Sequence, residues 1–197
     1  MKKLAYLSVA AASAIALASP AAAQDVTGTV NITGTVTAKC LVVPANSNSF
    51  GATVDLGELA KADGTLESSA TLETRFLSPT AGALSARVVC TSAAPTITVT
   101  ATPITITSAP APAAGYTGTV NYIAHAFVDT VSTNDVEFTD ASGGGGSGPT
   151  AIGGRLANNG SDNINITATN FATTSPTDLL FAGGYSGQIQ VVIAPGA

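Results

Sequence analysis

The run from Val26 to Cys40 places an apolar residue or glycine at every even-numbered position and Thr, Asn or Lys at every odd position. Because the side chains of a strand point alternately to its two faces, this pattern predicts extended structure with one apolar face. Ordinary strands are about 3–10 residues long, so the run is long for a single strand. No Asn-Gly, Asp-Gly or Gly-Gly pair interrupts it to make a tight reversal. We therefore expect two pieces, with Gly34 as a bulge or a flexible joint between them.

The residues before this run are typical of a secretory signal peptide. Lys2 and Lys3 precede an apolar, Ala-rich stretch that ends in Ala21-Ala22-Ala23. The stretch is too short, and wrongly flanked, for a membrane anchor. We expect residues 1–23 to be removed and the remaining chain to be exported as a soluble protein.

The charge of the chain argues against binding to nucleic acid or to anionic membranes. The net charge is −5, and removal of Lys2 and Lys3 would change it to −7. Such partners are bound by basic surfaces, which an acidic chain with few Lys and Arg lacks. Charged residues make up only 10% of the sequence, which is rich in Thr, Ala, Val and Gly and thus favours a β protein.

Two cysteines occur, Cys40 and Cys90. In an oxidising compartment two cysteines are expected to form a disulfide. Metal binding is the alternative, but two thiols without a further Cys or His pair are too few for a structural zinc site. We expect the disulfide and no metal.

Further strand-like runs lie between turn signals, and none has a helical period of comparable quality. They are residues 50–59, 70–77, 84–91, 96–107, 119–130, 136–139, 163–171 and 187–194. Eight or nine short strands at such spacing predict a single antiparallel sandwich or barrel. Pro103 cannot donate a ladder hydrogen bond, so it marks an edge, a bulge or a switch between sheets. Residues 108–118 are expected to be a long loop rather than an interdomain linker.

Catalytic signals are weak. His125 is the only histidine, and on the Asn121, Ile123 and Phe127 face of a strand it is expected to be a structural or surface residue. No Gly-x-Ser-x-Gly motif is present. The densest acidic cluster is a possible calcium site, but its spacing does not match an EF-hand loop and we expect a solvated loop; its members are Asp129, Asp135, Glu137 and Asp140. We therefore expect no enzyme and no cofactor.

The first half of the opening run has no evident partner. If Thr35 to Leu41 form the first strand of the domain, then Asp25 to Thr33 form a separate strand before it. Nothing nearby in the sequence would bury the apolar stripe of that strand. An unpaired apolar edge promotes aggregation unless a partner covers it. Insertion into a neighbouring molecule would supply ladder hydrogen bonds and pockets for alternate side chains, and Gly28 would fit where that groove is shallow. The alternative is a frayed or self-paired terminal strand.

Four stretches in order resemble a known family over nearly the whole mature chain. They are DVTGTVNITGTVTAKCLV, FGATVDLGEL, ALSARVVC and AGGYSGQIQVVIAP. Together they resemble the archaic, Csu-type chaperone-usher pilins, also described as spore-coat-protein-U-like domains.

The resemblance implies an all-β fold, an incomplete immunoglobulin-like sandwich that lacks its last strand and carries an N-terminal donor strand. A periplasmic chaperone would fill the open groove first, and the donor strand of an identical or related pilin would replace it at an outer-membrane usher. The implied domains are a signal peptide (1–23), a donor strand (24–34) and a pilin domain (35–197). By position, the implied functional residues are the donor-strand residues Val26, Gly28, Val30 and Ile32, the disulfide Cys40–Cys90, and the groove or chaperone-contact residues Tyr185, Ile189, Val191 and Ile193. The pattern of the opening run places the hinge at Gly34.

The expected function is therefore that of a structural subunit of an extracellular pilus on the cell surface, which polymerises by donor-strand exchange. The alternative is a monomeric secreted β-sandwich module that binds carbohydrate or a cell-surface ligand. The absence of Trp and the low aromatic content weaken this alternative, because sugar sites usually use stacked rings.

Overall fold

The computed structural model describes residues 27–43, 51–78, 84–108, 110–111 and 113–196. The expected signal peptide and Val26 lie outside the described residues. The chain divides into two units, Met1–Thr35 and Val36–Ala197, and every helix and strand of the described residues belongs to the second. The elements are β1 (Cys40–Val43), α1 (Ser69–Phe76), β2 (Ser85–Cys90), β3 (Thr96–Ile106), β4 (Tyr116–Thr117), β5 (Thr119–Val128), β6 (Val136–Ala141), β7 (Thr150–Ala151), β8 (Ile164–Ala172), β9 (Leu179–Leu180) and β10 (Tyr185–Ala194).

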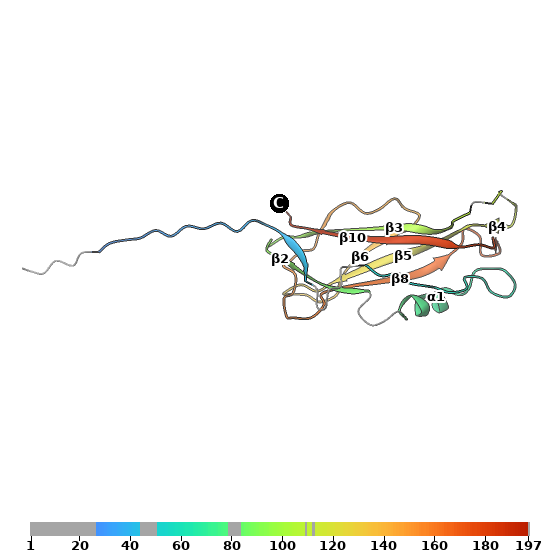
Figure 1. Cartoon of the computed structure of the whole chain (residues 1–197), viewed down its shortest axis with the longest axis horizontal. Helices are drawn as coiled ribbons and strands as arrows, with labels where there is room; N and C mark the ends of the chain where they lie inside the picture. Colours follow the sequence, from blue (N-terminus) through green and yellow to red (C-terminus); the bar gives the residue numbers. More distant parts are fainter. Residues whose placement is uncertain (1–26, 44–50, 79–83, 109, 112, 197) are drawn as a thin grey trace, which may run out of the picture. The chain divides into compact units, whose positions relative to one another are not determined.

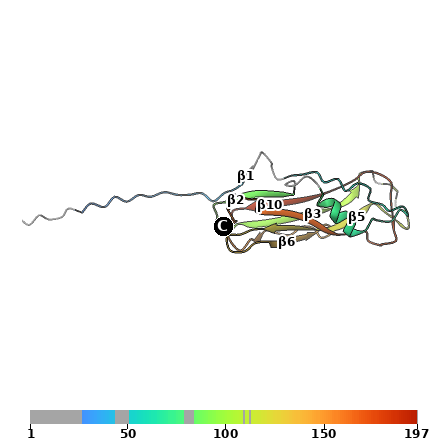
Figure 2. The same ribbon diagram turned by 90° about the horizontal axis from the view of Figure 1, so that it is seen from below.

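The predicted all-β class is confirmed, since the main sheet is antiparallel and the described residues form only one short helix. The main path of paired strands runs β1-β2-β8-β5-β3-β10, with β6 on β5 and β7 on β3. A separate parallel pair joins β4 to β9. Figures 1 and 2 both show β10 beside β3 along its length, and Figure 1 shows β8 beside β5.

The core follows from the alternation of residues in the central strands. In β5 the even-numbered side chains from Val120 to Val128 are 0–4% exposed, while the odd-numbered ones are half-buried on the other face. Inward residues of β3 and β8 join them in one core; these are Ile97, Val99, Ala101, Ile164, Ile166 and Ala168. Burial of such side chains contributes about 1.5–3 kcal/mol each for the larger ones.

Pro103 lies at a bulge between β3 and β10. Thr102 is paired with Gln188 and Thr105 with Ser186, so two residues of β3 oppose one of β10. Of the three predicted roles for Pro103, the bulge is confirmed. The hydroxyl of Tyr122 donates to the Gln188 carbonyl beside this irregularity at 2.9 Å, and burial raises the pKa of Tyr122 to about 12.

On the edge of β3 that faces away from β10, side chains take up much of the backbone hydrogen bonding. The Ala101 amide donates to Asp140 Oδ2 at 2.8 Å, and the Val99 amide donates to Ser147 Oγ at 3.2 Å. These bonds lie between the short pairings of β3 with β7 and with β5. The expectation of a solvated acidic loop is wrong for Asp140, which is only 9% exposed because it completes this edge.

Two predicted strands differ from the structure. The predicted strand 70–77 is instead occupied by helix α1 (Ser69–Phe76). Ser68 caps the first turn of the helix by accepting from the Thr71 amide, and Leu72 and Phe76, four residues apart, share its buried face. Residues 51–59 contain no strand; the Arg75 guanidinium donates to the Leu56 and Glu58 carbonyls of this segment. The predicted runs 84–91, 96–107, 119–130, 136–139, 163–171 and 187–194 correspond to β2, β3, β5, β6, β8 and β10.

Residues 108–118 lie within the second unit rather than between two units, and Tyr116 and Thr117 of this range form β4. The first strand begins at Cys40 rather than at Thr35, and residues 27–39 have no regular secondary structure. Within the residues that the structure describes, no helix has the length and apolar character needed to cross a bilayer.

Candidate strand-binding groove

The two strands at the ends of the main path, β1 and β10, each pair with one neighbour only among the described residues. β1 has four residues and pairs with β2, whereas β10 has ten and pairs with β3. The second edge of each strand therefore presents backbone N–H and C=O groups without a ladder partner in this part of the chain. Unpaired edges of this kind are sites for the addition of another strand.

A groove of about 100 Å³ is lined by both end strands. Its lining residues are Cys40, Leu41 and Val42 of β1, Val88 of β2, and Val191 and Ile193 of β10. Val88 is 4% exposed, whereas Leu41 and Val42 are 56% and 41% exposed. Since no lining side chain is charged, the groove favours an apolar, uncharged segment.

The inward face of β10 is incompletely covered. Ile189, Val191 and Ile193 pack against the core, yet all three are only half-buried. Their counterparts on β5 are almost fully buried. Each half-buried side chain leaves apolar area in contact with water, at a cost of about 25 cal/mol per Å². An added strand beside β10 would remove that cost.

The β1 wall of the groove is fastened to β2. Cys40 and Cys90 are register partners and form a disulfide, as predicted. The Asn163 side chain accepts from the Val88 amide and donates to the Val88 carbonyl, both at 2.8 Å, so it acts as a strand partner for the groove residue Val88. These contacts fix the position of the wall and of the floor.

The predicted donor-strand and hinge residues that the structure describes are all exposed. Val30 and Ile32 are 86% and 92% exposed. A Cβ atom added at Gly28 or Gly34 would have no other atom within 4 Å. Whether residues 24–34 form a donor strand and Gly34 a hinge stays a prediction, as does the boundary of the pilin domain at residue 35.

Of the predicted groove residues, Val191 and Ile193 line the groove, whereas Ile189 lies on the same face of β10 nearer its start. Tyr185 begins β10, and its hydroxyl donates to the Phe181 carbonyl at 2.9 Å. Burial raises the pKa of Tyr185. Sequence reasoning missed Leu41, Val42 and Val88. The only signal for the first two was the apolar run Cys40 to Val43, where the alternation ends.

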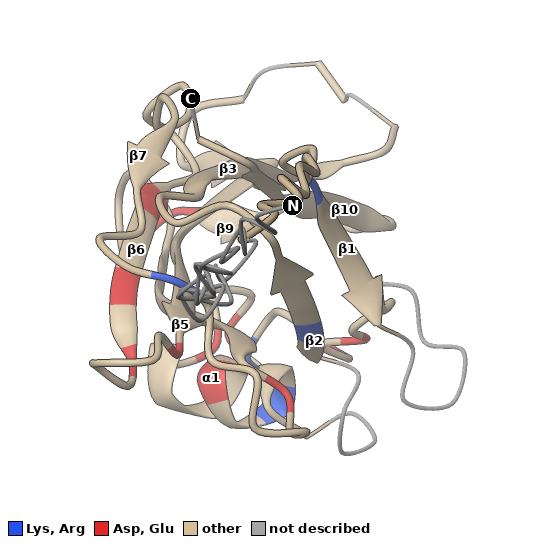
Figure 3. Cartoon of the chain, turned by 90° about the vertical axis from the view of Figure 1, so that its left-hand side faces the viewer, with Lys and Arg blue, Asp and Glu red and all other residues tan. Residues whose placement is uncertain are grey.

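A second hollow of about 220 Å³ lies near the start of β8. It is lined by Ser85, Phe127, Asp129, Asp135, Asp162, Asn163, Ile164 and Asn165. Figure 3 shows that further acidic residues lie on β6, which carries Glu137 and Asp140. Among the described residues, no group of three or more His, Cys, Asp or Glu side chains is arranged to hold a metal ion.

His125 bridges three strands on the outer face of the sheet. Its Nδ1 lies 2.5 Å from Glu137 Oε1 on β6, and its Nε2 lies 2.7 Å from Thr169 Oγ1 on β8. The His125 side chain is 16% exposed and lines neither hollow. These contacts give it a structural part in cross-strand bonding.

Comparison of the chain with protein-family models, curated proteins and solved structures found no significant match. The groove geometry therefore carries the functional argument. Two unpaired strand edges and an apolar floor can bind an extended segment through main-chain hydrogen bonds, with alternate side chains in the groove.

Proposed function

We propose that this chain is a non-enzymatic structural subunit of an extracellular pilus, with an incomplete immunoglobulin-like sandwich, and that it polymerises by donor-strand exchange. The observation that carries the proposal is the open groove between β1 and β10, above Val88, with the half-buried stripe of β10 beside it. A sandwich with one strand missing would leave such a groove.

The opening run of the chain supplies a segment of matching character. Its even-numbered residues from Val26 to Ile32 are apolar or glycine, as a strand over an apolar floor requires. Val30 and Ile32 are exposed, so they are free to enter the groove of a second copy. In the proposed pathway a periplasmic chaperone occupies the groove first, and the donor segment replaces it at an outer-membrane usher.

Removal of residues 24–33 tests the proposal. The shortened chain should fold, remain monomeric and form no filaments, as judged by size-exclusion chromatography and electron microscopy. A synthetic peptide of residues 24–35 should then bind it and raise its Tm, because a ligand that binds only the folded state stabilises it by mass action.

The matched control is the same peptide with Val30→Asp and Ile32→Asp. It has the same length and backbone but places carboxylates over the apolar floor. Equal Tm shifts with both peptides, or filaments from the shortened chain, would count against donor-strand exchange.

A monomeric secreted binding module is the second candidate. The hollow at Phe127, with polar side chains around one aromatic ring, favours it. The expected signs would be a stable monomer that retains residues 24–34 and binds glycans on an array. Loss of that binding in Phe127→Ala, with polymerisation absent throughout, would favour this function over the pilus subunit.

A further inference from the structure

An aromatic pair, with Tyr116 exposed and Phe181 half-buried, lies at the end of the domain where β10 begins. Tyr116 and Phe181 are stacked, with ring centroids 5.3 Å apart, and Tyr116 is 46% exposed. The parallel pairing of β4 with β9 and a bond from the Phe181 amide to the Thr117 carbonyl hold the pair in place. Because Tyr185 donates to the Phe181 carbonyl, the pair adjoins the first residue of β10.

Val36 is also apolar and exposed, and no described residue covers its side chain. Its side chain is 81% exposed. It continues the even-numbered apolar series and lies four residues after Ile32, which is about 13 Å along an extended chain. In β10, Tyr185 precedes Ile189 by the same four residues.

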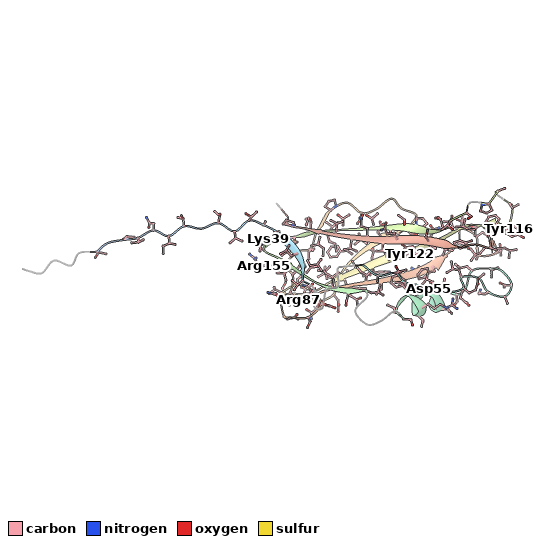
Figure 4. The ribbon with its side chains drawn as sticks, viewed as in Figure 1. Lys39, Asp55, Arg87, Tyr116, Tyr122 and Arg155 are labelled. Carbon is pink, nitrogen blue, oxygen red and sulfur yellow. A yellow bond between two sulfur atoms is a disulfide. The ribbon has the colours of Figure 1, made fainter. Side chains whose placement is uncertain are left out.

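The direction in which the donor segment enters the groove follows from the linear, head-to-tail growth of the proposed filament. In Figure 4, Lys39 and Tyr116 lie at opposite ends of the domain. A head-to-tail filament requires the incoming chain to leave the groove at the end opposite to the start of the acceptor's own β1. That end is the one with Tyr116, so the donor segment runs antiparallel to β10 and its later residues lie toward Tyr185.

The side-chain pattern then selects the register. Alternation restricts the possible registers to steps of two residues. If Ile32 lies beside Ile189, Val30 lies beside Val191 and Gly34 beside Gly187, at the bulge. A Cβ atom at Gly187 would lie only 2.9 Å from the Ile104 side chain of β3, so Gly187 has no room for a side chain on the β3 side, and Gly34 would place none on the open side. In this register Val36 lies beside Tyr185.

We propose that Val36 of one copy packs on the Tyr116–Phe181 pair of the next copy and forms a second contact between neighbouring subunits. The contact rests on the proposed donor-strand exchange and extends it beyond the groove. It would cover an apolar residue and an aromatic surface that the single chain leaves exposed. It would also fix how one domain follows the next.

Cysteine cross-linking of assembled filaments tests this contact. The double variant Val36→Cys/Tyr116→Cys is treated with a short bismaleimide, which links free thiols and leaves the Cys40–Cys90 disulfide intact. The expected result is a ladder of dimers, trimers and longer species on a denaturing gel. The matched control is Val36→Cys/Val131→Cys. Val131 is also exposed, at 73%, but its amide donates to the Arg155 carbonyl, and Figure 4 shows Arg155 at the end of the domain opposite to Tyr116. This control should give no ladder.

The outcomes distinguish a failure of the Val36 contact from a failure of the proposed donor-strand exchange. Filaments of normal appearance that give no ladder, or equal ladders from both variants, overturn the contact and leave donor-strand exchange standing. If the unchanged chain forms no filaments, both proposals fail. Because all three substituted positions are exposed, none of the variants removes a core side chain.

Discussion

Cys40 and Cys90 face each other as register partners of β1 and β2, and their disulfide closes a loop with a sequence separation of 50 residues. A cross-link at this position ties down a four-residue strand whose Leu41 and Val42 are largely exposed. The groove therefore depends on a covalent bond at one wall.

Loss of this disulfide should strongly destabilise the domain. In the chain-entropy model, a loop of this length contributes about 4 kcal/mol. Cys40→Ser/Cys90→Ser should lower the free energy of unfolding by about that amount in urea titrations. Addition of reductant should destabilise the unchanged chain but not the variant; an equal response of the two proteins would contradict this account.

Under the proposed donor-strand exchange, the apolar face of residues 24–34 should decide polymerisation. Val30→Asp should abolish filaments, because it would bury a carboxylate in an uncharged groove. Thr29→Asp adds the same charge one residue earlier, on the opposite face, and should still polymerise. Both positions are exposed in the single chain, so the two monomers should have equal Tm values. Filament yield by sedimentation compares them, and equal loss in both variants would refute the assignment of faces.

The groove can be tested in the same way with two neighbouring residues of β10. Val191 lines the groove, whereas Val192 points outward and is 47% exposed. Val191→Glu should prevent binding of the 24–35 peptide, as measured by calorimetry on the chain lacking residues 24–33. Val192→Glu should leave its affinity within a factor of about 3, as for a surface change. Comparable losses in the two variants would mean that the peptide binds elsewhere.

The Asn163 side chain should be important for stability. It is 2% exposed and bonds to the amide and carbonyl of Val88 and to the Ala157 carbonyl. Asn163→Ala would leave buried backbone groups unpaired and should cost about 3 kcal/mol in chemical unfolding. The control Asn165→Ala, at an exposed position of β8, should change stability by less than about 0.5 kcal/mol. A small effect at both positions would show that water replaces the Asn163 contacts.

Stability should fall at alkaline pH because of Tyr122. Its pKa is about 12 in the folded chain and near 10 in the unfolded chain. Between these values the unfolded chain loses the phenol proton first, so the free energy of unfolding falls by about 2–3 kcal/mol as pH rises from 10 to 12. Below pH 10 both states are protonated and this contribution is constant. Urea unfolding between pH 9 and 12 should have a flatter pH dependence in Tyr122→Phe, and an unchanged slope would exclude Tyr122 as the cause.

Much of the fold was predictable where alternation is long and uninterrupted. β3, β5, β8 and β10 have clear two-residue periods, so the sequence predicted their positions to within about two residues. Helix α1 was missed because its buried face consists of only Leu72 and Phe76, while its start depends on the Ser68 cap. Eight residues give too few turns for a helical period to stand out from a strand pattern.

The groove was only partly predictable. The stripe Ile189, Val191 and Ile193 is visible in the sequence, because alternation indicates which side of β10 faces inward. The sequence did not indicate that Leu41, Val42 and Val88 form the remaining lining, since this depends on the register of β1 against β2 and on Asn163 behind Val88. Such long-range pairings bring together residues that no local pattern connects.

The closure of β3 by Asp140 and Ser147 bears on the number of neighbours that each molecule can have. Hydrogen-bonding positions at Val99 and Ala101 are already occupied, so a foreign strand cannot add there. Under the proposed assembly, each copy then offers one slot and one insert. A molecule with a valence of two forms unbranched chains, each with a free slot at one end and a free insert at the other.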